Sequence, residues 1–193
     1  MKHIWLIRHA ESKSQVGDTD EHINPELSDQ GRQQAHQLTK RLIGLHPDCT
    51  LISPLRRAWQ TYEISGTKST QVEFDSRLIE SNWGNLQVYK EIMPVDTPDI
   101  AEPDLHDAWL ISDSARISRL LIDLLQRDVE NILLFGHWGT FNHLLLSFLG
   151  INVTNNSLRA TMDNASISLL EVDDNQNRYL RYWNDRSHIL DLP

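Results

Sequence analysis

Two short apolar runs, each followed by a histidine, constrain the fold of this chain more than any other feature. Residues 4–7 lead directly into Arg8 and His9, and residues 132–135 lead through a glycine into His137. A short continuous apolar run predicts a buried strand, but a core cannot absorb an unpaired charge. We therefore expect both strands to end at the edge of a sheet, where α/β proteins bind ligands.

The remainder of the chain alternates predicted strands and helices. Apolar residues at helical spacing predict a helix over residues 28–45, with Ser28 as its N-cap. A second helix is expected to run to about residue 65, with Ser53 as N-cap and Pro54 at the first helical position. Two more helices are expected, one capped by Ser112 or Asp113 and one between His137 and Gly150. Further strands are predicted at residues 49–52, 71–74, 165–172 and 178–183.

This alternation predicts an α/β fold. Strands separated by helices favour a mainly parallel central sheet with helices on both faces, a three-layer sandwich. Residues 178–183 follow a turn and add an antiparallel hairpin. The length of 193 residues is typical of one domain, residues 1–193. Residues 85–111 hold no periodic pattern and contain three prolines, so we expect a variable insertion or lid there.

Composition excludes several classes of function. The net charge is −9 and no run of lysine or arginine stands out, which argues against nucleic-acid binding. No apolar run approaches the roughly 20 residues of a membrane span. The N-terminus shows no signal peptide, and Cys49 has no second cysteine to pair with. We therefore expect a cytoplasmic protein with no membrane partner; the oligomeric state is left open.

The expected topology brings together side chains suited to phosphate chemistry. Parallel crossovers place Arg8, His9, Arg57 and His137 on one rim of the sheet. Arginine presents a planar fork of donors that matches phosphate oxygens. A neutral histidine can attack phosphorus and form a phosphohistidine, and nearby arginines favour the neutral form. The leaving alkoxide needs a proton from a carboxylic acid. Side chains supply the positive charge, so the chemistry requires no metal and no cofactor.

Six segments then carry a more specific signal. They are Arg8-His9-Ala10-Glu11-Ser12, Leu27-Ser28-Asp29-Gln30-Gly31, Ser53-Pro54-Leu55-Arg56-Arg57-Ala58, Leu78-Ile79-Glu80 with Trp83-Gly84, Gly136-His137, and Asn164-Ala165-Ser166-Ile167 with the tail at 184–188. In this order they resemble the signature of the histidine phosphatase superfamily, the phosphoglycerate mutase-like enzymes. The resemblance extends along most of the chain, and it implies the phosphoglycerate mutase-like fold.

The resemblance also implies a role for each matching residue. His9 would be the nucleophile that is phosphorylated and dephosphorylated in each turnover. Arg8 and Arg57 would clamp the phosphate, and His137 would be its second histidine ligand. Glu80 would be the general acid and then the base that activates water.

Three features depart from the family pattern: Ser112-Asp113-Ser114 stands where the mutases usually have a Gly-Glu-Ser motif, and two single positions differ. Gln15 stands where family members often have asparagine, and we expect it to make the same contact with the phosphate. Trp138 follows the second histidine, where a small residue is common. Its indole either narrows the site and stacks on a substrate ring or packs away from the pocket.

The resulting hypothesis is a metal-independent phosphatase that hydrolyses small phosphomonoesters through a phosphohistidine. A short chain with a limited insertion favours hydrolysis over phosphoryl return to the same substrate. Two alternatives of other classes stay open: a phosphoglycerate-type mutase, and a non-catalytic module on this fold that binds phosphate or protein. Within the phosphatase class, a phosphoprotein substrate also stays open. The other histidines show no metal-ligand spacing, so we expect no metal site.

Overall fold

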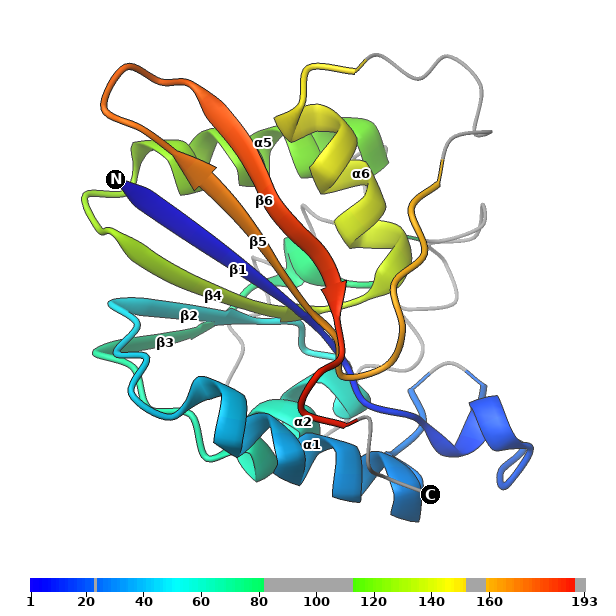
Figure 1. The fold of residues 1–193 in the computed structure, drawn as a ribbon. Helices are drawn as coiled ribbons and strands as arrows, with labels where there is room; N and C mark the ends of the chain where they lie inside the picture. The colour runs from blue at the N-terminus through cyan, green and yellow to red at the C-terminus, as the bar shows by residue number, and fades with distance from the viewer. Residues whose placement is uncertain (23, 82–112, 152–158, 190–193) are drawn as a thin grey trace.

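The computed structural model describes residues 1–22, 24–81, 113–151 and 159–189. Its centre is a six-stranded sheet with the order β3-β2-β4-β1-β5-β6 (Figure 1). The strands are β1 (Lys2–Arg8), β2 (Cys49–Ile52), β3 (Gln71–Phe74), β4 (Asn131–Gly136), β5 (Ile167–Val172) and β6 (Arg178–Asp185). The described α-helices are α1 (Asp29–Leu42), α2 (Arg56–Ser65), α5 (Asp113–Gln126) and α6 (Trp138–Phe148).

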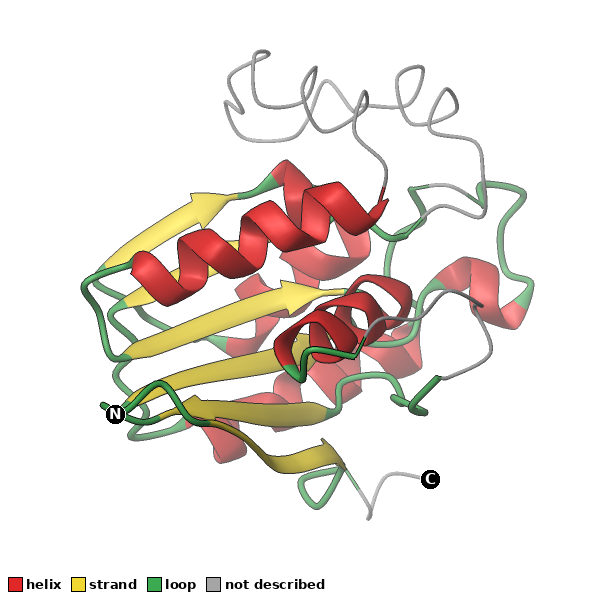
Figure 2. Ribbon diagram, turned by 90° about the horizontal axis from the view of Figure 1, so that it is seen from above, coloured by secondary structure: helices red, strands yellow, loops and turns green. Residues whose placement is uncertain are grey.

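The helices form two layers, one on each face of the sheet. Helices α1 and α2 pack together on one face, and α5 and α6 pack together on the other (Figures 1 and 2). Alternation along β4 serves both faces: Ile132 and Leu134 belong to the core on the α5–α6 side, whereas Leu133 and Phe135 belong to the core on the α1–α2 side. The predicted three-layer α/β architecture is confirmed.

The sheet is parallel where the expected site lies. Strand β1 pairs with β4, β4 with β2, and β2 with β3, all in parallel. Strand β5 is antiparallel to β1 and to β6, which forms the predicted hairpin. The carboxyl ends of β1, β2 and β4 therefore meet at one edge, because parallel neighbours in register end side by side.

The predicted strands are found, β6 runs two residues beyond the predicted end at Trp183, and three further boundaries need correction. Helix α1 ends at Leu42 rather than Leu45, because Ile43 is already extended and Gly44 has a φ of +81°. Strand β5 begins at Ile167 rather than at Ala165, whose φ is +54°. Ser28 caps α1 as predicted, since its hydroxyl accepts a hydrogen bond from a backbone N–H in the first turn.

The third correction concerns the start of α2. The predicted cap, Ser53, lies outside the helix with Pro54, and Leu55 is the N-cap residue. The Ser53 N–H donates to the Phe135 carbonyl at 2.9 Å, so this residue extends the pairing of β2 with β4 instead of starting a helix. The predicted insertion at 85–111 lies outside the described residues. Within the described ranges, no helix has the length and hydropathy needed to cross a bilayer.

Candidate active site

Backbone hydrogen bonds at the ends of the parallel strands bring the two predicted histidines together. The His9 N–H donates to the Gly136 carbonyl at 2.9 Å, which places the residue after β1 beside the end of β4. The imidazole rings of His9 and His137 lie 5.0 Å apart between centroids and are inclined by 54°. Both side chains are buried. Histidines 128 residues apart in the sequence thus form one polar cluster at the carboxyl edge of the sheet.

The hydrogen bonds of His9 define its tautomer. Its Nδ1 lies 2.7 Å from the Ala10 carbonyl oxygen, which can only accept a hydrogen bond, so Nδ1 carries the proton. Nε2 accepts a hydrogen bond from the Nε of Arg57 at 3.3 Å. Burial lowers the pKa of His9 well below its ordinary value of 6.5, and the charges of Arg57 and Arg8 lower it further. His9 is therefore a neutral imidazole with its lone pair on Nε2.

His137 is held from the end of β2. The hydroxyl of Ser53 lies 2.8 Å from His137 Nε2. The other ring nitrogen, Nδ1, is buried and has no hydrogen-bond partner among the described residues. Burial lowers the pKa of His137 well below its usual range, and the charges of Arg57 and Arg8 act in the same direction. One nitrogen of this ring is thus fixed, while the other remains available to a ligand.

Arg57 and Arg8 add positive charge to this cluster. Arg57 lies in the first turn of α2 and is buried. The Thr61 hydroxyl donates to the Arg57 carbonyl at 2.6 Å and accepts from the Ala10 N–H at 3.0 Å, which ties α2 to the segment after β1. Arg8, the last residue of β1, donates through Nη1 to the carbonyl of Met162. Two guanidinium groups are therefore fixed around the neutral imidazoles.

Glu80 lies close enough to this cluster to interact with both arginines. Its Oε1 accepts hydrogen bonds from the N–H groups of Ser81 at 2.8 Å and Thr140 at 3.2 Å. Burial raises the pKa of Glu80 above its ordinary value, although Arg57, these N–H donors and Arg8 oppose the rise. A carboxyl group with a raised pKa retains its proton at higher pH, as a general acid requires.

Gln15 lies at the exposed margin of the cluster, in the 3-10 helix η1 (Lys13–Val16). Its Oε1 accepts from the Ser12 N–H at 3.0 Å, and its amide pairs with the amide of Asn164. Asn164 Nδ2 also donates to the His9 carbonyl at 3.1 Å. Among the described residues, Gln15 is therefore linked to His9 through Asn164, and its contact with a phosphate stays a prediction.

Trp138 is anchored to the segment at residues 159–160. Its indole N–H donates to the Ala160 carbonyl at 2.8 Å, and the Arg159 guanidinium carbon lies 5.4 Å from the ring centroid. These contacts account for the ring without a substrate. The ring is half-buried against the core on the α5–α6 side, and its position relative to a bound substrate stays a prediction.

The sequence assigned no role in the site to Ser53, Thr61 or Asn164. Ser53 was predicted only as a helix cap. A usable signal was its place directly after β2, equivalent to that of His9 after β1 and His137 after β4. Asn164 falls in one of the six segments that resemble the family signature, but its contact and that of Thr61 depend on how α2 and the segment before β5 pack.

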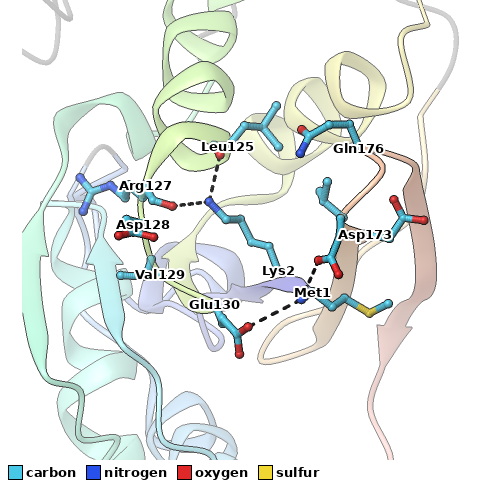
Figure 3. A pocket seen from close by; sticks show the side chains of 11 residues that line it. Met1, Lys2, Leu125, Arg127, Asp128, Val129, Glu130, Asp173 and Gln176 are labelled. Atoms are coloured by element: carbon cyan, nitrogen blue, oxygen red, sulfur yellow. Dashed lines mark hydrogen bonds and ion pairs between the residues drawn. The ribbon is translucent and has the colours of Figure 1, made fainter.

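A cavity of about 250 Å³ lies at the opposite end of the sheet, around Met1, Lys2 and Glu130 (Figure 3). The Lys2 ammonium donates there to the carbonyls of Leu124, Leu125 and Arg127, at the end of α5. The cavity lies at the amino end of β1, whereas the histidine cluster lies at the carboxyl end, so the two are separate. Among the described residues, no group of three histidine, cysteine or acidic side chains is arranged to hold a metal ion.

Comparison with known proteins places the chain in a family. The family model of the histidine phosphatase superfamily (branch 1) matches residues 4–186. Phosphoserine phosphatase 1 of Hydrogenobacter thermophilus is 27% identical over 195 residues, which cover 94% of this chain and 92% of that protein. The glucosyl-3-phosphoglycerate phosphatase of Mycolicibacterium vanbaalenii is 26% identical over 191 residues, covering 86% and 82% of the two chains.

Solved structures share the fold. The crystal structure of phosphoserine phosphatase from Entamoeba histolytica, in complex with 3-phosphoglyceric acid, aligns with a TM-score of 0.67 and 20% identity. The alignment covers 98% of this chain and all of that one. The family match over nearly the whole chain, together with the relatives named as phosphatases, shows that the protein belongs to the histidine phosphatase superfamily, branch 1, and is a phosphatase, a phosphoric monoester hydrolase.

Proposed function

We propose that His9 is the nucleophile of this phosphatase and that the reaction passes through a phosphohistidine. The observation that carries the proposal is the state of His9: a neutral ring whose Nδ1 proton is held by the Ala10 carbonyl, with Nε2 facing Arg57. In the first step the Nε2 lone pair forms a bond to phosphorus while the bond from phosphorus to the leaving oxygen breaks. Glu80 gives its proton to that oxygen, and the alcohol leaves.

In the second step the roles of the carboxyl group reverse. The Glu80 carboxylate takes a proton from water, the water oxygen bonds to phosphorus, and the bond from phosphorus to Nε2 breaks. Inorganic phosphate forms and His9 returns to its neutral state. Arg8, Arg57 and Nδ1 of His137 bind the phosphoryl oxygens in both steps and stabilise the charge of the transition state. No metal or cofactor enters this scheme.

We infer that the substrate is a small phosphorylated molecule with an alkyl leaving group. The support comes from the relatives, which are named for phosphoserine and glucosyl-3-phosphoglycerate. A pKa-raised carboxyl group fits such substrates, because an alkoxide leaves poorly without a proton. The expected cytoplasmic location, the absence of nucleic-acid partners, the single domain and the insertion at 85–111 stay predictions.

Phosphate release from a panel of phosphomonoesters tests this function. The panel is run with EDTA and without added metal, on wild type, on His9→Ala and on the control His36→Ala, which removes an exposed histidine of α1. We expect release by wild type and the control and a loss of at least about 10³-fold in His9→Ala. An acid-labile phosphoprotein should accumulate transiently in wild type and should not form in His9→Ala.

Two outcomes contradict the proposal. Release that EDTA abolishes would exclude the metal-free route. Full activity in a folded His9→Ala protein would exclude the phosphohistidine. Return of the phosphoryl group to a second position of the same substrate, without release of phosphate, would favour the mutase alternative.

A further inference from the structure

Buried hydrogen-bond donors hold the backbone of the segment that carries Glu80. The Ile79 carbonyl oxygen accepts two hydrogen bonds, each of 2.6 Å, from the Thr140 hydroxyl on α6 and from Arg116 Nη1 on α5. The same Arg116 nitrogen donates to the Arg77 carbonyl at 2.8 Å. Thr140 and Arg116 are 0% and 2% exposed. Buried donors on two helices thus converge on the residue directly before the acid.

Thr140 also contacts the carboxyl group itself. Its backbone N–H donates to Glu80 Oε1 at 3.2 Å. The N-cap residue of α6 is His137, whose side chain makes no capping hydrogen bond. Glu80 therefore satisfies an N–H group that the helix start leaves open. One helix start both carries the second histidine and fixes the acid, so these two groups are held at a constant separation.

Gly139 allows this close approach. A Cβ atom at this position would lie 2.7 Å from Glu80 Oε1 and 3.1 Å from the Ser81 Cβ. The carboxyl group thus lies against the bare backbone of the first helical turn. This contact leaves Glu80 little freedom to move sideways along the helix.

The arrangement also distinguishes the two carboxyl oxygens. Both hydrogen bonds that Glu80 accepts from the described residues fall on Oε1. N–H donors stabilise an unprotonated oxygen, so the acid carries its proton on Oε2. The proton to be transferred is thereby confined to one oxygen of a carboxyl group whose backbone and side chain are both held.

We propose that Thr140 is a positioning residue for the general acid, with Arg116 holding the same carbonyl from the neighbouring helix. The proposal rests on the role of Glu80 as the acid in the proposed function. A positioned acid matters in proportion to the need of the leaving group for a proton. An alkyl phosphate leaves as a strongly basic alkoxide, whereas p-nitrophenyl phosphate releases a stable phenolate that needs little protonation.

The test compares kcat/KM for these two kinds of substrate, because kcat/KM reports the first phosphoryl transfer. Thr140→Val removes the hydroxyl group and keeps both the shape and the N–H, and Thr140→Ser keeps the hydroxyl. Thr39→Val is the matched control: it removes a similar bond, from the Thr39 hydroxyl to the Ser65 carbonyl at 2.9 Å, in the α1–α2 layer. Glu80→Gln removes the proposed proton donor and shows how strongly each ester depends on it. The alkyl ester is phosphoserine, unless another alkyl ester of the panel is hydrolysed faster, in which case that ester is used.

We expect Thr140→Val to lower kcat/KM for the alkyl ester by about 10- to 100-fold and for the aryl ester by less than about threefold. Thr140→Ser should retain most of the wild-type kcat/KM for the alkyl ester. Thr39→Val should change kcat/KM for the two esters by the same factor. Equal losses on both esters, or no loss on either, would overturn the proposal. If Glu80→Gln also lowers kcat/KM equally for both esters, Glu80 is not the general acid. If Glu80→Gln lowers kcat/KM more for the alkyl ester and Thr140→Val does not, only the positioning role of Thr140 is wrong.

Discussion

At the scale of single residues, burial moves two pKa values toward each other. The first step needs a neutral His9 and a protonated Glu80. Ordinary pKa values of 6.5 and 4.5 would make this combination rare at every pH, because the carboxyl group loses its proton before the imidazole does. In the folded protein burial lowers the pKa of His9 and raises that of Glu80. The same desolvation thus prepares both the nucleophile and the acid.

This opposition predicts the pH dependence of kcat/KM for an alkyl ester. As pH falls, activity is lost when His9 gains a proton, and this limb should lie below pH 6.5 because the pKa of His9 is lowered. As pH rises, activity is lost when Glu80 gives up its proton, and this limb should lie above pH 4.5. The measurement is kcat/KM from pH 4 to 9 for wild type and Glu80→Gln.

The glutamine variant is the control for this profile. Ionisation of the substrate affects both proteins equally, so only the alkaline limb should disappear in Glu80→Gln, together with about 10²- to 10⁴-fold of the activity. An alkaline limb that persists unchanged in the variant would show that another group supplies the proton.

At the scale of elements, the start of α1 is fitted to the segment after the nucleophile. The Ser28 N–H donates to the Glu11 carbonyl at 3.0 Å, and the Ser28 hydroxyl donates to Glu11 Oε1 at 2.7 Å. Gly31, in the first turn, approaches the same carbonyl so closely that a Cβ atom would lie 1.9 Å from its oxygen. The helix start thus determines the path of the chain two residues beyond His9.

We therefore predict that Gly31→Ala destabilises the protein, although alanine is the better helix former. The clash is with backbone, which cannot rotate away, so the free energy of unfolding should fall by about 1–3 kcal/mol. Urea unfolding measures this, with Gln33→Ala, at an exposed position of the same helix, as the control. The changes in the free energy of unfolding of the two variants should have opposite signs or differ by at least about 1 kcal/mol. Equal stability of Gly31→Ala and wild type would contradict the close packing.

At the scale of the whole molecule, the site is assembled from three strand ends and lies within the protein between the helix layers. His9 and His137 are buried as neutral rings, whereas both titrate freely in the unfolded chain. Their folded-state pKa values are lowered, so the unfolded state binds protons first as pH falls. The active site therefore makes the fold sensitive to acid.

The expected outcome is a loss of stability that begins as pH falls through about 6.5 and continues down to the lowered pKa values of the two histidines. The free energy of unfolding in urea is measured at pH 7.5 and pH 5 for wild type and His9→Gln. The difference between the two proteins gives the contribution of His9 to the loss of stability. The loss should be smaller in the variant by on the order of 1 kcal/mol. The carboxylates and the remaining histidines titrate in both proteins. An identical loss in the two would mean that His9 is not buried in its neutral form.

The sequence by itself determined the elements and their order. Residues 49–52 and 71–74 are strands at the predicted bounds, Ser28 caps α1 as predicted, and the alternation of apolar runs and helical stripes predicted the three layers. These features depend on neighbouring residues and on the periods of strand and helix, which are visible in a short window of sequence. The placement of Arg8, His9, Arg57 and His137 at one edge followed from the parallel crossovers.

The tertiary structure alone decided which side chains hold these groups. Ser53 turned from a predicted cap into the partner of His137 because its N–H pairs with β4 and its hydroxyl meets a ring 84 residues away. Thr140 and Arg116 meet the Ile79 carbonyl across three elements, and Gln15 reaches Asn164 across 149 residues. Such contacts leave no periodic trace in the sequence, because they form only when separate elements pack to within hydrogen-bond distance.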